Sequence, residues 1–157
     1  MTTLEFGVDF FYLMQYLQFK GNPTACDVFD HAVVDLLLFQ WGLTIEEVDE
    51  AHRLAVKKAE NNQLGNVTDA IVRLTKYASE DVGRKMQLVA DLATVVSVQK
   101  YNLTDAQKNI VDGFQSLLDM RPSEFQFAIN RGIELAAELA VIGHQFAAAN
   151  RIRANPK

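Results

Sequence analysis

Helix-start signals recur along this sequence, and signals for β-strands are almost absent. At three places after the N-terminal segment, a Ser or Thr is followed three residues later by Glu or Gln: Thr44–Glu47, Thr104–Gln107 and Ser123–Gln126. This spacing is the capping box, in which the hydroxyl accepts a hydrogen bond from the third helical amide and the longer side chain accepts one from the cap amide. Residues 4–10 alternate as a strand would, but the apolar run continues to Phe19, and that length favours a helix. The sequence therefore predicts an all-α fold.

Chain breakers and caps divide the sequence into about seven helices that form one bundle. Gly21-Asn22-Pro23 ends the first helix, and Gly42 lies where a helix end needs the left-handed conformation. The predicted helices span residues 1–20, 24–41, 44–62, 68–78, 79–100, 104–118 and 123–151. Short connections in a chain of 157 residues predict a single helical domain over 1–157, made of the N-terminal helix (1–20), a first helical half (24–78) and a second helical half (79–152).

The two halves share a helix corner at an offset of 60 residues. Trp41-Gly42-Leu43-Thr44-x-x-Glu47 and Tyr101-Asn102-Leu103-Thr104-x-x-Gln107 each combine an aromatic helix end, a residue that tolerates positive φ, a Leu and a capped helix start. One interpretation is a pair of helical hairpins related by a pseudo-twofold axis. The other is that any two helix corners converge on this chemistry.

Charge and cysteine content narrow the classes of function. The net charge is −5, which argues against nucleic acid as a partner because a phosphate backbone needs a positive surface. The single cysteine, Cys26, cannot form an internal disulfide, which suits the cytoplasm, and the acids near it favour a structural thiol over a reactive one. Glu5 and Asp9 interrupt the apolar N-terminus, so this segment predicts neither a secretory signal nor a transmembrane helix.

The N-terminal helix is unusually aromatic. Six of the fifteen aromatic residues lie within Phe6–Phe19. Three interpretations are open: the helix covers the core, it forms a face for a protein partner or a second copy of the chain, or it lines a pocket for an apolar ligand. Core cover is the commonest of these, and any partner or homo-oligomer contact is expected to use this helix.

The strongest candidate metal site is a stripe on the second predicted helix. Asp27, His31 and Asp35 are spaced by four residues, so they share one face, and carboxylates with an imidazole are metal ligands. The same spacing also produces ordinary exposed acid–histidine pairs. No cofactor is expected, and a divalent metal at this stripe is the alternative.

A second acid–histidine pair, Asp49-x-x-His52, resembles the carboxylate-x-x-His pair of di-iron bundles. Such a site needs a second pair of this kind, and the sequence has none. Glu134 and Glu138 could add carboxylates, but we expect them to pair with Arg131 on the helix surface. No residue is predicted to be catalytic, since no serine lies in a nucleophile-elbow context.

From about Met86 to Phe146 the chain resembles the TerB-like domains of tellurite-resistance and stress-response proteins. The resemblance rests on a long apolar helix (Leu88-Val-Ala-Asp-Leu-Ala-Thr-Val-Val), a corner followed by Leu103-Thr-x-x-Gln107, a helix ending in Leu117-Leu-Asp-Met, and Ser123-Glu at the start of the last helix. It implies a seven-helix fold and a non-enzymatic accessory role in stress response, including peripheral association with membrane complexes.

The chain departs from the family pattern at the position that implies metal binding. The family's corner carries Asp-Gly followed by an acid, whereas here Lys100-Tyr101 and Gln107 stand in those places. The first corner has Gln40-Trp41 but keeps the acid as Glu47. The leading prediction is therefore a non-enzymatic interaction or sensing module. The alternatives are a metal-binding protein or metal-dependent enzyme using the stripe, and an apolar-ligand binder.

Overall fold

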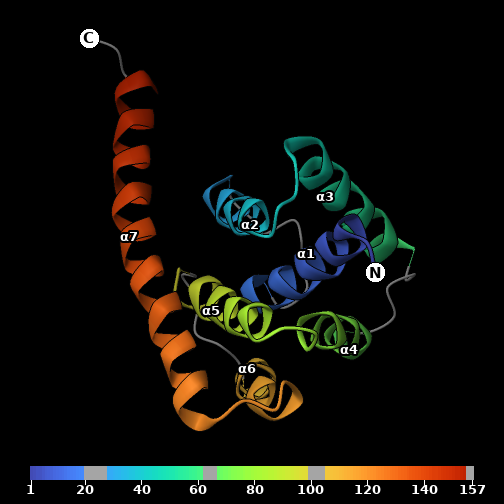
Figure 1. The fold of residues 1–157 in the computed structure, drawn as a ribbon. Helices are drawn as coiled ribbons and strands as arrows, with labels where there is room; N and C mark the ends of the chain where they lie inside the picture. The colour runs from blue at the N-terminus through green and yellow to red at the C-terminus, as the bar shows by residue number, and fades with distance from the viewer. Residues whose placement is uncertain (20–27, 62–66, 99–104, 155–157) are drawn as a thin grey trace.

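The computed structural model describes the backbone of residues 1–19, 28–61, 67–98 and 105–154, and the side chains of these except 18–19, 28–31, 59 and 143–154. Within the described residues the chain forms seven helices and no strand, which confirms the all-α prediction. The helices are α1 (Thr3–Phe19), α2 (Val28–Gln40), α3 (Ile45–Glu60), α4 (Val67–Ala78), α5 (Val82–Val98), α6 (Asp105–Leu117) and α7 (Pro122–Ala154) (Figure 1). None of the helices in the described part is both long and apolar enough to cross a membrane.

Helix α1 lies at the centre of the bundle, and this explains its aromatic content. It packs against α2, α3, α4 and α5. Phe6, Phe10 and Phe11 are at most 1% exposed, so burying them removes much of the helix's apolar surface from water. The monomer itself covers these three rings, and a partner face elsewhere on α1 stays a prediction. Neither of the described pockets is lined by α1, so the apolar-ligand pocket also stays a prediction.

Polar contacts fix the position of α1 within this apolar setting. Asp9 is almost fully buried, and both of its carboxylate oxygens accept hydrogen bonds from the Arg73 guanidinium of α4, at 2.8 and 2.9 Å. Gln107 of α6 donates to the carbonyl oxygens of Tyr16 (2.9 Å) and Leu17 (3.3 Å), which belong to the last turn of α1. Both contacts satisfy groups that burial would otherwise leave without a partner.

The first predicted capping box is confirmed. The Thr44 amide donates to Glu47 Oε1, and the Glu47 amide donates to Thr44 Oγ1, each at 3.1 Å. Gly42 has φ of 92°, the left-handed conformation expected after α2. Thr104, the cap of the second predicted box, and Cys26 lie outside the described residues.

Two other predicted helix caps are each wrong by two residues. The predicted box at Ser123 is displaced because Pro122 occupies the first helical position, where its missing N–H costs nothing. Arg121 is the cap instead, and its amide donates to Glu124 Oε1 at 3.2 Å, which is one half of a capping box. Likewise α5 begins after Asp81, whose carboxylate accepts the amide of the second helical residue, and does not begin at residue 79.

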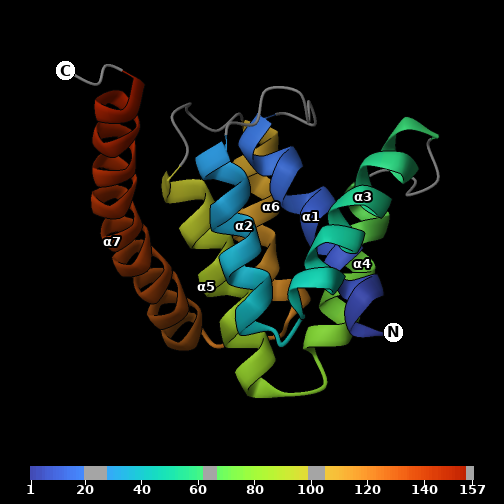
Figure 2. The same cartoon turned by 90° about the horizontal axis from the view of Figure 1, so that it is seen from above.

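Helix α7 is the longest element and crosses α5 at close range. Gly132 makes this approach possible, since a Cβ there would lie 2.2 Å from the Ala90 carbonyl oxygen. Thr94 Oγ1 donates to the Ala90 carbonyl (2.9 Å) and to the Gly132 carbonyl (3.1 Å), which links the two backbones. Beyond this crossing α7 extends away from the other helices, and α5 lies beside its first half (Figure 2).

Candidate functional site

The predicted metal stripe is only partly described. Asp27 and the side chain of His31 lie outside the described residues, while Asp35 is a half-buried residue of α2. Among the described side chains, no group of three or more His, Cys, Asp and Glu residues could hold a metal ion. The stripe therefore stays a prediction.

Asp35 is coupled to the acid–histidine pair of α3, a relation that sequence spacing did not indicate. Burial raises the pKa of Asp35, the charge of His52 lowers it, and the charge of Asp49 raises it. The His52 ring also stacks against the Phe11 ring at 5.1 Å between centroids. His52 thus belongs to the packing between α1, α2 and α3.

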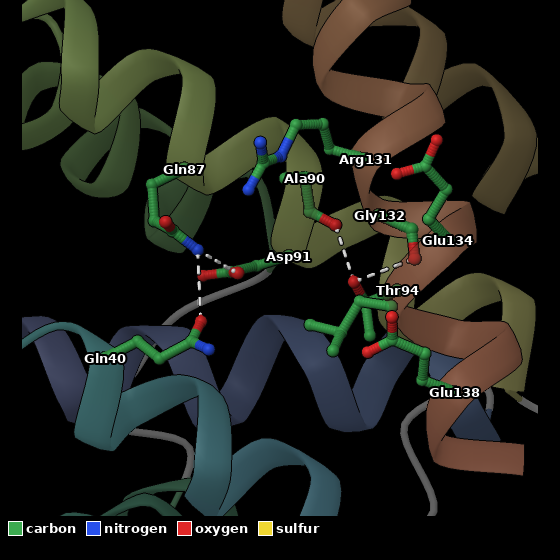
Figure 3. Close-up of a pocket in the computed structure, with 10 residues that line it drawn as sticks. Gln40, Gln87, Ala90, Asp91, Thr94, Arg131, Gly132, Glu134 and Glu138 are labelled. Carbon is green, nitrogen blue, oxygen red and sulfur yellow. Dashed lines mark hydrogen bonds between the residues drawn. The ribbon is translucent and has the colours of Figure 1, made fainter. Parts of the chain in front are cut away.

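The structure places a different group of polar residues together, at a pocket between the end of α2, the middle of α5 and α7 (Figure 3). Its volume is about 530 Å³, within the range of small-molecule sites. The polar lining comprises Gln40 from α2, Gln87, Asp91 and Thr94 from α5, and Arg131, Glu134 and Glu138 from α7. None of these was predicted as a site residue.

Asp91 is the buried carboxyl group of this pocket. It is 1% exposed, and its two oxygens accept hydrogen bonds from Trp41 Nε1 and from Gln87 Nε2, both at 2.6 Å. Burial raises the pKa of Asp91 to about 7, and the hydrogen bonds from Trp41 and Gln87 act in the opposite direction. Asp91 therefore changes charge near neutral pH.

Local structure explains how the donors reach Asp91. The corner after α2 is closed by a hydrogen bond from the Trp41 amide to the Leu38 carbonyl at 3.0 Å. The Trp41 ring then packs against Phe6, with ring centroids 4.5 Å apart, so its Nε1 is held at a fixed angle. Gln87 lies one helical turn before Asp91 on the same face of α5, the spacing that lets the two side chains meet.

The sequence contained a signal for Asp91. It is the single acid in the apolar run Leu88-Val89-Ala90-Asp91-Leu92, and a carboxyl group in the buried part of a helix needs partners. The donors themselves could not be found in this way, because Trp41 lies 50 residues away and meets Asp91 only through tertiary packing.

The charged side chains of α7 line the pocket without pairing with one another. No ion pair joins Arg131 to Glu134 or Glu138 among these described residues, so the expected surface pairing does not form. Figure 3 shows the Arg131 guanidinium extending toward α5, and Glu138 at the far end of the pocket from Arg131.

The arrangement is suited to binding and lacks a nucleophile with a base among the described residues. The hydroxyl that lines the pocket belongs to Thr94, and its proton is directed to two carbonyl oxygens. Asp91 could act as an acid or base at neutral pH, but both of its oxygens are already hydrogen-bonded and it is closed off from solvent. No protein-family model, curated protein or solved structure matches the chain.

Proposed function

We propose that the protein is a non-enzymatic sensing module that binds a small polar molecule in the pocket between α2, α5 and α7. The observation that carries this proposal is the buried Asp91 carboxyl group in a pocket of about 530 Å³, held in place by Trp41 and Gln87. Because Asp91 accepts a hydrogen bond from Gln87, this side chain of the pocket lining is held in place before a ligand arrives, and preorganised polar groups are typical of a specific binding site.

The resemblance to TerB-like domains supports an accessory role over an enzymatic one. The first corner, where the family pattern has Asp-Gly, carries Gln40 and Trp41 here; Gln40 lines the pocket and Trp41 holds Asp91. The family pattern implies metal binding at this corner. In this chain the same corner carries side chains that form hydrogen bonds at the pocket. A single cysteine and an acidic charge balance support a cytoplasmic location.

A ligand panel tests the proposal. The purified protein is heated with amino acids, short peptides, nucleotides, sugar phosphates and carboxylic acids, each at millimolar concentration, and Trp41 fluorescence is recorded in parallel. We expect at least one compound to raise the midpoint of thermal unfolding, because a ligand that binds only the folded state stabilises it. The same compound should change the fluorescence of Trp41, the chain's single tryptophan.

Two matched variants locate the effect. Ala90→Leu adds three carbons to a residue that lines the pocket, and Ala106→Leu makes the same change on an exposed position of α6. Ala90→Leu should abolish the stabilisation, and Ala106→Leu should preserve it. The proposal fails if no compound stabilises the protein, or if Ala90→Leu responds as the parent does.

The divalent-metal alternative stays a prediction, because two of the three stripe residues have no described side chain. Elemental analysis of protein purified without added metal tests it. Stoichiometric iron, manganese or zinc that is lost in His31→Ala would support that alternative.

A further inference from the structure

We infer that the ligand of this pocket is a dipolar molecule with a carboxylate and an ammonium group about 10 Å apart, the dimensions of a tripeptide with free ends. This inference rests on the proposed function and adds the chemical class of the ligand. The observation behind it is the placement of opposite charges at the two ends of one pocket wall.

Arg131 and Glu138 are seven residues apart on α7, and both line the pocket. Seven residues make almost two full turns, so the two side chains share a face, and a rise of 1.5 Å per residue separates them by about 10.5 Å along the axis. They do not form an ion pair with each other in the described structure. Each charge is therefore placed to meet a separate group of a ligand that lies along α7.

The chemistry of each end assigns the polarity of the ligand. A guanidinium binds a carboxylate through two parallel hydrogen bonds, which favours the carboxylate at Arg131. The Glu138 carboxylate accepts hydrogen bonds from an ammonium group. An extended peptide advances about 3.3–3.6 Å per residue, so three residues span the distance between these ends.

The middle of the wall fits a peptide with small apolar side chains. Leu135 lies on the same face of α7, one turn from each charged residue, and is partly buried. Across the pocket, the Gln87 amide nitrogen donates to Asp91 at 2.6 Å and lies 3.4 Å from Gln40 Oε1. The Gln87 carbonyl and the Gln40 amide can then face the peptide groups of the ligand, one as acceptor and the other as donor.

Calorimetric titration with trialanine tests the inference. Trialanine should bind, and free alanine, whose charges are too close together to reach both ends, should bind at least tenfold more weakly. Acetylating the N-terminus or amidating the C-terminus of trialanine should each weaken binding about fivefold, the effect of losing one exposed ion pair.

Variants identify which end of the ligand each residue binds. Arg131→Gln should weaken binding of trialanine but leave binding of its C-terminal amide unchanged. Glu138→Gln should weaken binding of trialanine but leave binding of its N-acetyl form unchanged. Glu60→Gln is the matched control, because it removes the same charge from an exposed residue of α3 that does not line the pocket, and it should change nothing.

The results separate this inference from the function on which it rests. One outcome would support the proposed function and contradict this inference. In that outcome trialanine does not bind, while another compound of the panel stabilises the protein and loses its effect in Ala90→Leu. The inference of a dipolar ligand is also wrong if blocking either end of the peptide has no effect, or if Glu60→Gln weakens binding as much as Glu138→Gln.

Discussion

Replacing Asp91 by asparagine should remove a large part of the pH dependence of stability. The pKa of Asp91 is about 7 in the folded protein, against 3.8 for an unburied aspartate, so the folded state holds this proton more tightly than the unfolded state. The stabilising contribution of the protonated group is complete below pH 3.8 and is lost as the pH rises through 7. Each pH unit in this window changes the free energy of unfolding by about 1.4 kcal/mol.

The change in the free energy of unfolding between pH 5 and pH 8 follows from these pKa values. The window contains about two full units below the folded pKa, so the wild type should lose about 3 kcal/mol relative to Asp91→Asn, which does not titrate. In a chain of 157 residues this corresponds to a change of about 6–12 °C in the unfolding midpoint. The introduced amide would still accept the hydrogen bond from Trp41, and rotation of the Gln87 amide would present an acceptor to its NH₂ group.

Urea denaturation followed by far-UV circular dichroism measures this difference at intervals from pH 5 to pH 8. All other titratable groups are common to both proteins, so the difference between the two free energies isolates Asp91. The free energy of unfolding of Asp91→Asn, relative to that of the wild type, should increase steadily as the pH rises. This difference should level off above pH 7. A difference that stays constant over the whole range would refute the assignment of a raised pKa to a buried Asp91.

Three further predictions test the packing of the helices, the cap of α3 and the buried ion pair of α1. Gly132→Ala should lower stability by about 2–3 kcal/mol or more, because its Cβ would lie 2.2 Å from the Ala90 carbonyl oxygen, whereas Gly113→Ala, which meets nothing within 4 Å in α6, should raise stability by about 0.5–1 kcal/mol. Thermal unfolding of the two variants checks this contrast, and equal effects would contradict the close approach of α5 and α7. Thr44→Ala should cost about 1 kcal/mol in urea denaturation through loss of the cap of α3. Arg73→Met should cost about 2–3 kcal/mol at pH 7 by leaving the Asp9 carboxylate buried without its partner, and recovery of stability in the Asp9→Asn/Arg73→Met double variant would show that the cost comes from the unpaired charge.

Local sequence was a reliable guide to helices and an uneven guide to their ends. Thr44 and Glu47 cap α3 as predicted, because both partners of the box lie within four residues of each other. The start of α7 was misplaced because Ser123 and Pro122 offer competing signals, and proline at the first helical position prevailed. Such competition is decided by small energies that residue type alone does not rank.

The candidate site could not be predicted because its residues come from distant parts of the chain. Asp91 was visible as an acid in an apolar helix, but its partner Trp41 stands at a corner that the sequence presented only as a turn. Arg131 and Glu138 looked like ordinary surface charges of a long helix, and the crossing of α7 over α5 makes them the wall of a pocket.

Residue types and their spacing are enough to predict that this chain is helical, where most of its helices lie and that its N-terminal helix is apolar enough to be buried. Periodicity, capping and glycine conformations are local properties, and neighbours along the chain suffice to read them. Tertiary structure alone decided that α1 is the centre of the bundle, that Gly132 brings α5 and α7 together, and that Asp91 lies beside a pocket. These depend on which surfaces exclude water from one another, and that is a property of helices already packed.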